Sequence, residues 1–360
     1  MPGLRAAGWA AMVAASVVLQ GCQAPFPKVS ETSKVHIQLA RSACFGWCPA
    51  YVVDIAEDGT VTYDGTSSVA VSGRFQDRIA PSDVAALVAR FDQAKFFSLQ
   101  DEYMAPIKDS PFYKMTLTID GRTKTVVDYE GQMVGMPAIV TELEDAIDQA
   151  AGTAKFVKGT PETIPMLRRD GFDFTSSKAA TFLADALEID SEIYASQLIE
   201  AGAPLNGHTT RRGDPAFQLL DTVSPGGKAT AEQMIEAAIA RGSRQDRTDA
   251  LWPTVELDDA DLLRRLIAKG ADVRIVHPEV PWITLLISAK SEAVVRVLLG
   301  AGLDPNGLKP GLRPLLSTDS EDIALVLLRA SGTLGDQTKA ALIARARKLG
   351  WTRLLARLGA

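Results

Sequence analysis

The stretch LIAKGADVR at residues 266–274 decides the fold of the second half of the chain, because variants of it recur. Residues 198–206 have the sequence LIEAGAPLN and residues 298–306 have LLGAGLDPN. Weaker copies occur at residues 238–242 (AIARG) and 327–332 (LLRASG). The steps from residue 198 to 238, 266, 298 and 327 are 40, 28, 32 and 29 residues. Recurrence at this period predicts a stack of similar helical units.

Each copy combines an apolar helix face with a glycine stop. Val294-Val295 and Leu298-Leu299 lie one helical turn apart, so they share a face that can be buried against the next unit. The following glycine ends the helix in the left-handed conformation. The Gly270-Ala271-Asp272-Val273 and Gly302-Leu303-Asp304-Pro305-Asn306 runs resemble ankyrin repeats. The resemblance implies an all-α ankyrin-type helical solenoid over residues 155–360, with a surface that binds a protein.

The repeats depart from the ankyrin pattern where each first helix begins. The usual Thr-Pro-Leu-His is reduced to Asp214-Pro215-Ala216-Phe217 and to Arg313-Pro314-Leu315-Leu316. We therefore expect an irregular stack of about five repeats. We also expect a degenerate opening repeat at residues 166–172, an insertion near Ser224-Pro225-Gly226-Gly227 and a basic helical cap over residues 337–358.

The first half of the chain alternates between strand and helix patterns. Period-two alternation predicts strands, and Asp58-Gly59 and Asp120-Gly121 predict hairpin turns. Glu144 falls among acids assigned to the exposed face of the last helix. The order βββ-α-ββ-α predicts an α+β domain over residues 35–152, with an antiparallel sheet and two helices. The expected strands are residues 35–39, 51–55, 60–63, 113–119 and 123–129, and the expected helices are residues 82–93 and 137–150.

This first unit resembles a bacterial domain of unknown function catalogued as DUF6438. The resemblance is carried by residues 41–51 (RSACFGWCPAY), the two Asp-Gly turns and Asp128-Tyr129. The Cys-Phe-Gly-x-Cys-Pro core is its most distinctive part. The resemblance implies a fold relationship, and the family has no established activity to transfer.

The N-terminus has the pattern of a cleaved export signal. Arg5 precedes a run of about 14 apolar residues, whereas a helix needs about 20 to span a bilayer. The run ends in VVLQGC at residues 17–22, which resembles a bacterial lipobox. We expect residues 1–21 to be a lipoprotein signal peptide, Cys22 to be lipidated and residues 22–34 to be a tether. An ordinary signal peptide with an incidental cysteine is the alternative.

Lipidation at Cys22 would place the protein in the bacterial cell envelope, anchored to a membrane and facing the periplasm. Gln23 rather than Asp after the cysteine favours the outer membrane by resemblance to sorting rules in enteric bacteria.

Cys44 and Cys48 then remain as a pair in an oxidising compartment, where a structural disulfide is expected. One alternative is a redox-active pair, although the spacing is three residues and no helix N-terminus follows. Another is a metal site formed with His36, although a closed zinc site needs four ligands and His208 and His277 lie in the other unit.

Charge and motifs restrict the function further. The net charge of −6 lacks the basic footprint of a nucleic-acid binder. The sequence contains no nucleophile elbow, HExxH, P-loop, dinucleotide-binding glycine motif or EF-hand loop. We expect a monomeric, non-enzymatic protein without cofactor or metal, which binds an envelope protein through its repeats. A thiol-redox or metal-dependent function at Cys44 and Cys48 is the alternative.

The lipobox makes a direct prediction. Replacing the lipid-bearing cysteine, Cys22→Ser, should move the protein from the membrane to the soluble fraction, because acyl chains are the expected anchor. Fractionation of cells by ultracentrifugation measures this, and a Cys44→Ser/Cys48→Ser variant should stay with the membrane. Unchanged membrane fractionation of Cys22→Ser would contradict the lipoprotein interpretation.

Overall fold

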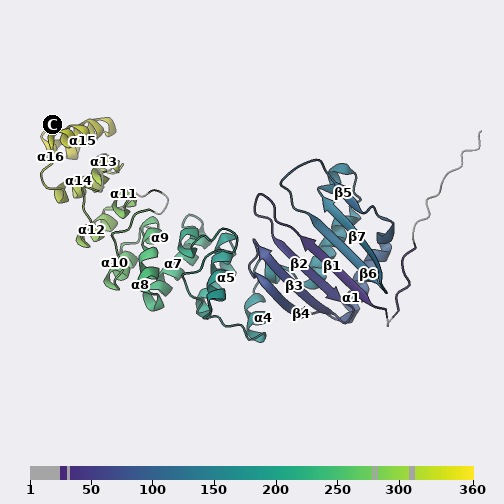
Figure 1. The fold of residues 1–360 in the computed structure, drawn as a ribbon. Coiled ribbons are helices and arrows are strands. Elements are labelled where there is room, and N and C mark those ends of the chain that lie inside the picture. Colours follow the sequence, from purple (N-terminus) through teal and green to yellow (C-terminus); the bar gives the residue numbers. More distant parts are fainter. Residues whose placement is uncertain (1–24, 31–32, 278–279, 281–282, 308–312) are drawn as a thin grey trace, which may run out of the picture.

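The computed structural model describes residues 25–30, 33–277, 280, 283–307 and 313–360. Two units lie next to each other in the ribbon (Figure 1). The first is a sheet backed by helices, and the second is an elongated row of helices that ends at the C-terminus. This arrangement agrees with the predicted division into a sheet-containing unit followed by a helical unit.

The first unit contains a seven-stranded sheet in the order β4-β3-β2-β1-β6-β7-β5. All neighbouring strands pair antiparallel except β5 and β7, which are parallel. The strands are β1 (Val35–Arg41), β2 (Ala50–Ala56), β3 (Thr60–Ser67), β4 (Gly73–Arg78), β5 (Glu102–Met104), β6 (Tyr113–Ile119) and β7 (Arg122–Tyr129).

The predicted pattern βββ-α-ββ-α is therefore wrong in detail, because it omits β4 and β5. Both are edge strands. The sequence of β4, GRFQDR, has a single apolar residue, so it lacks the alternation that marks a half-buried strand. The three residues of β5 lie in a segment whose polar composition is typical of a loop. Edge strands depend on pairing with a neighbour, which the local sequence does not encode.

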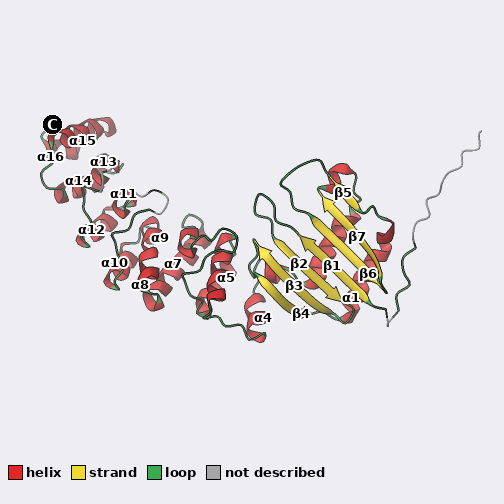
Figure 2. Ribbon diagram, viewed as in Figure 1, coloured by secondary structure: helices red, strands yellow, loops and turns green. Residues whose placement is uncertain are grey.

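Two helices, α1 (Pro81–Gln93) and α2 (Ile139–Ala151), cover one face of the sheet (Figure 2). The predicted cap at Ser82 is wrong, because Ala80 is the N-cap of α1 and makes no side-chain capping bond. The other face is polar. Thr116 and Thr118 meet Thr125 and Thr123 across the β6–β7 pair. One wet face is typical of an antiparallel sheet.

The second unit packs its helices in two rows. In one row α6, α7, α10, α12, α14 and α16 contact one another in sequence. In the other, α5 packs on η3, and α9, α11, α13 and α15 contact one another in sequence. The elements are α3 (Ala154–Val157), α4 (Thr163–Arg169), α5 (Ser177–Glu188), α6 (Glu192–Ala201), η3 (Ala216–Leu219), α7 (Pro225–Arg241), α8 (Arg244–Asp249), α9 (Leu251–Glu256), α10 (Ala260–Ala268), α11 (Leu285–Ser288), α12 (Glu292–Gly300), α13 (Pro314–Ser317), α14 (Glu321–Ala330), α15 (Asp336–Leu349) and α16 (Thr352–Leu358).

The insertion expected near residues 224–227 lies at the start of a helix, α7. Ser224 caps α7 by accepting a hydrogen bond from the Gly227 N–H, and Pro225 is its first residue. Proline suits that position because its missing N–H has no helical partner there. The extra length of the 40-residue step is taken up partly by α7, which has 17 residues against 9 in α10 and α12.

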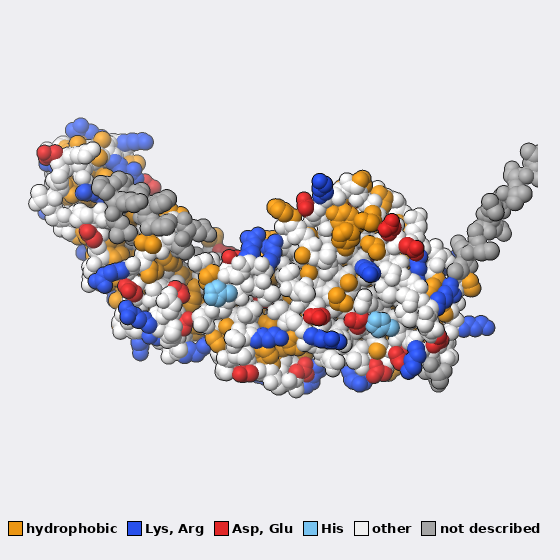
Figure 3. Space-filling model, in the orientation of Figure 1, with side chains coloured by type: hydrophobic (Ala, Val, Ile, Leu, Met, Phe, Trp, Pro, Cys, Tyr) orange, Lys and Arg blue, Asp and Glu red, His pale blue; other side chains and the backbone are white. Residues whose placement is uncertain are grey.

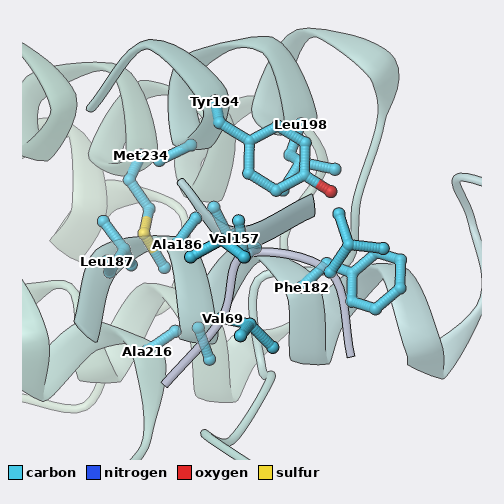
Figure 4. Packing of buried hydrophobic residues seen from close by; sticks show 14 of the residues in the cluster. Val69, Val157, Phe182, Ala186, Leu187, Tyr194, Leu198, Ala216 and Met234 are labelled. Atoms are coloured by element: carbon cyan, nitrogen blue, oxygen red, sulfur yellow. The ribbon is translucent and has the colours of Figure 1, made fainter. Parts of the chain in front are cut away.

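The two units share a continuous hydrophobic core. Val69, from the loop after β3, and Val157, from α3, lie among side chains of α5 and α6 (Figure 4). The N–H groups of Ala70 and Val71 donate to the carbonyls of Val157 and Phe156, at 3.0 and 2.9 Å. The helical stack is therefore fastened to the sheet through both backbone and side chains.

The described part of the predicted tether is not free. The Phe26 ring packs edge-on against Phe97 with centroids 5.5 Å apart, and Arg122 donates to the carbonyl of Pro25 at 2.7 Å. An apolar aromatic that can reach a hydrophobic surface packs on it. Among the described helices, none is long and apolar enough to cross a membrane.

Candidate functional site

The loop between β1 and β2 carries the two cysteines that the sequence pairs. Cys44 and Cys48 form a disulfide with sulfurs 2.01 Å apart and Cα atoms 5.5 Å apart. The loop residues 42–49 leave the sheet at the end of β1 and return at the start of β2. Cys22, the predicted lipidation site, lies outside the described residues.

This loop contacts the helical unit, which the sequence did not indicate. Arg211, in the connection between α6 and η3, donates from Nη2 to the Gly46 carbonyl at 2.6 Å. The guanidinium groups of Arg211 and Arg212 lie 4.3 and 5.0 Å from the centre of the Trp47 ring, within cation–π range. The disulfide thus holds Trp47 in contact with Arg211 and Arg212 of the second unit. This favours a structural role for the disulfide.

The groups proposed for a metal site do not come together. His36 lies near the start of β1 and pairs with Asp54, with Nε2 and Oδ1 2.9 Å apart. Cys44 follows the end of the same strand, so about 20 Å of strand separate it from His36. His208 and His277 belong to the helical unit. In the described ranges, no group of three or more His, Cys, Asp or Glu side chains could hold a metal ion.

A buried acid near the end of the sheet escaped the sequence analysis. Glu144 on α2 is 3% exposed, and its Oε1 has no hydrogen-bond partner among the described residues. Burial raises its pKa to about 8, with a further contribution from the charge of Asp128. The prediction that Glu144 lies on an exposed face is wrong. Its spacing from Val140 and Ile147 places it on the buried stripe of α2, which a helical projection could have shown.

Beside this acid is a well-paired cluster at the end of β1. Arg41 binds Asp148, with Nη2 and Oδ2 2.6 Å apart, and its guanidinium lies 4.6 Å from the centre of the Tyr113 ring. Asp148 also accepts a hydrogen bond from the Tyr51 hydroxyl at 2.6 Å. These contacts tie α2 to three strands, so the cluster has an evident structural role.

A hollow of about 910 Å³ lies on the helical unit. Its walls are residues 205–208 and 215–222 on one side and residues 275–288, where described, on the other. Its floor includes Asp249 and Trp252 from α8 and α9. We refer to this feature as the hollow. None of its lining residues was predicted as a site, because they come from elements far apart in the sequence.

The surface outside the hollow has no single charge sign on the face shown. Lys and Arg side chains are interspersed with Asp and Glu over both units in Figure 3, and hydrophobic side chains gather over the region of β5 and β7. Met104 of β5 and Phe112 before β6 are among the large exposed apolar residues, at 45% and 42%.

Residues 35–151 match the family model described as "Domain of unknown function (DUF6438)". The predicted resemblance of the first unit is confirmed, with nearly the same boundaries. The DUF6438 domain thus comprises the whole sheet together with α1 and α2. Its description contains no activity, so the match identifies a fold relationship.

The helical unit has a weaker likeness among solved structures. It is similar to "Crystal structure of the ankyrin repeat domain of Bcl-3: a unique member of the IkappaB protein family", at 17% identity and a TM-score of 0.24. The similarity covers 46% of this chain and 90% of that chain. No curated protein matches the chain. The two-row stacking of the helical unit is shown by the contacts between its own helices.

Glu144 makes the stability of the DUF6438 domain depend on pH. The pKa of the Glu144 carboxyl is raised from its usual 4.5 to about 8 in the folded protein. Between these pH values the unfolded chain ionises this carboxyl, whereas the folded protein keeps it protonated. The wild-type protein should therefore lose stability as pH rises from about 4.5 to 8, by about 1.4 kcal/mol per pH unit at most. Glu144→Gln should remove this loss, raising stability at pH 8.5 and changing it little at pH 4.5.

Urea unfolding at several pH values measures this difference. Glu142→Gln, an exposed acid on the same helix, is the matched control and should leave the pH profile unchanged. Equal pH profiles for wild type and Glu144→Gln would contradict the assignment of the buried acid.

Proposed function

We propose that this protein is a membrane-anchored envelope lipoprotein that binds a protein partner, without catalysis, through ankyrin-type repeats in its helical unit. The observation that carries the proposal is the two-row helical stack with a large hollow between its connecting loops. Stacked helical repeats present extended surfaces that are used for binding proteins.

Local geometry supports the ankyrin-type assignment. Gly202 and Gly270 follow α6 and α10 with φ of 98° and 92°, so they end these helices in the left-handed conformation. The chain then projects as a short hairpin before the next helix. Isolated antiparallel bridges, His208 with Pro215 and Val276 with Thr284, close two of these hairpins. Helix, glycine stop and projecting hairpin is the expected order of an ankyrin-type repeat.

The envelope location is supported by the lipobox-like VVLQGC stretch and by the cysteine pair. A disulfide between Cys44 and Cys48 suits an oxidising compartment. Gln23, which follows the expected lipidation site, favours the outer membrane by resemblance to enteric sorting rules. Because Phe26 packs on the DUF6438 domain, an anchor at Cys22 would hold that domain close to the membrane, with the helical stack extending from its other side.

The state of the cysteine pair separates this proposal from a thiol-redox function. Protein isolated from the periplasm should show no alkylation of Cys44 or Cys48, and a glutathione buffer near −200 mV should leave the pair oxidised. Mass spectrometry after alkylation measures this, with a strong phosphine reductant as the control that exposes both thiols. A pair that cycles readily in the glutathione buffer would favour the redox function.

Site-specific photo-crosslinking in cells tests protein binding. A photoreactive phenylalanine at Val223 or Ile193, exposed apolar positions of the helical unit at 91% and 62%, should yield a discrete crosslinked partner. The same group at Arg90, on the exposed side of α1, is the matched control and should not give that product. Absence of a product from both helical positions, or identical products from all three, would contradict the proposal.

A further inference from the structure

One connection of the helical stack is much shorter than its neighbours. Residues 202–215 join α6 to η3, and residues 269–284 join α10 to α11. Between these two, α7 passes to α8 through Gly242 and Ser243 alone. Ser243 starts α8 with a reciprocal capping box to Asp246, so the turn is tightly closed. The stack therefore lacks a projecting hairpin at one position, flanked by hairpins on both sides.

The hollow occupies the position of this missing hairpin. Its two walls come from the flanking hairpins, and its floor comes from the helix pair that follows the short turn. The first wall is held closely against the stack, because a Cβ at Gly207 would lie 1.8 Å from the carbonyl oxygen of Ala180 on α5. The hollow is thus a formed feature of the fold, at the upper end of the usual volume of ligand pockets.

A single helical stripe forms the floor. Gln245, Asp249, Trp252 and Glu256 are spaced by four, three and four residues, so they share one face of α8 and α9. The stripe is open to the hollow, and it presents carboxylate, amide and indole groups.

The charged side chains among the described residues that line the hollow are acidic. Asp249 and Glu256 line it, and no Lys or Arg is found among its described lining residues. Glu256 is neutralised from outside by Lys290, with Nζ 2.7 Å from Oε2. Asp249 is only partly exposed, and its carboxylate accepts a hydrogen bond from the side-chain amide of Gln245 at 2.7 Å. Burial raises the pKa of Asp249. A positive charge bound beside this carboxylate would favour its ionised form.

Trp252 lies one helical turn from Asp249 and adds an aromatic surface on which a cationic group can stack. An indole within reach of a carboxylate can stack on a guanidinium or ammonium group that the carboxylate binds. The His277 ring meets Trp252 edge-on, with centroids 5.1 Å apart, and so links the floor to the second wall.

We propose that the hollow receives an extended peptide segment of a partner protein in place of the missing hairpin, with a lysine or arginine of that segment bound to Asp249 and Trp252. This inference rests on the proposed protein-binding function and specifies the class of segment that the helical unit recognises. Partners bound elsewhere on the stack would leave that function intact and contradict the inference.

Display of random hexapeptides tests this. The library is selected on the full wild-type chain in detergent, and each recovered peptide is then tested for binding to the Asp249→Asn variant. Recovered peptides should share a lysine or arginine. A synthetic copy in which that residue is replaced by a neutral analogue, citrulline for arginine or acetyl-lysine for lysine, should bind about tenfold more weakly, as expected for loss of one charge-assisted pair.

A double-mutant cycle tests whether Asp249 pairs with the basic residue of the peptide. Asp249→Asn and the change to the neutral analogue should each weaken binding about tenfold, and together no more than either alone. Glu232→Gln, an exposed acid on α7 away from the hollow, is the matched control and should bind like wild type. Recovery of no peptide, of peptides without a basic residue, or of peptides that bind Asp249→Asn equally well would overturn the proposal.

Discussion

The structure depends on the packing of α3 against the sheet. The Phe156 ring stacks on Tyr63 of β3, with centroids 4.4 Å apart and planes within 10°. The neighbouring Val157 accepts the Ala70 N–H and lies in the core between the two units. A four-residue helix has little stability alone. Here α3 attaches the helical stack to the DUF6438 domain. Its side chains lie in the hydrophobic core that the two units share, and its carbonyls accept hydrogen bonds from the loop after β3.

Polar contacts around this fastening restrict how the units can move. Asp77 on β4 pairs with both Lys155 and Arg169 of the helical side. Away from this edge strand, the disulfide loop between the interior strands β1 and β2 is bound by Arg211 through Gly46. Polar contacts at two separate places around a hydrophobic junction resist rotation about it. A protein anchored near its first domain would therefore present the hollow at a fixed distance and orientation from that domain.

The sequence predicted the main features for clear physical reasons. Hydrophobic periodicity and glycine stops identified α6, α7, α10, α12 and α14 in the second unit, because each of these signals is local. The cysteine pair was also predictable, since only three residues, among them Gly46, separate Cys44 from Cys48. Edge strands β4 and β5 were missed because their stability comes from pairing. The prediction for Glu144 was wrong because it was based on the charge of the side chain and not on its position on the buried stripe of α2.

By itself, the sequence determined the order of the units, the helical repeat and the closed disulfide loop, all of which follow from residues near one another in the chain. Only the tertiary structure decided where these parts meet. Trp47 and Arg211 contact each other across two units, and no local pattern relates them. The hollow likewise exists because two hairpins flank a two-residue turn. Whether such a gap is filled depends on how successive repeats stack, which is a property of packing rather than of any one stretch of sequence.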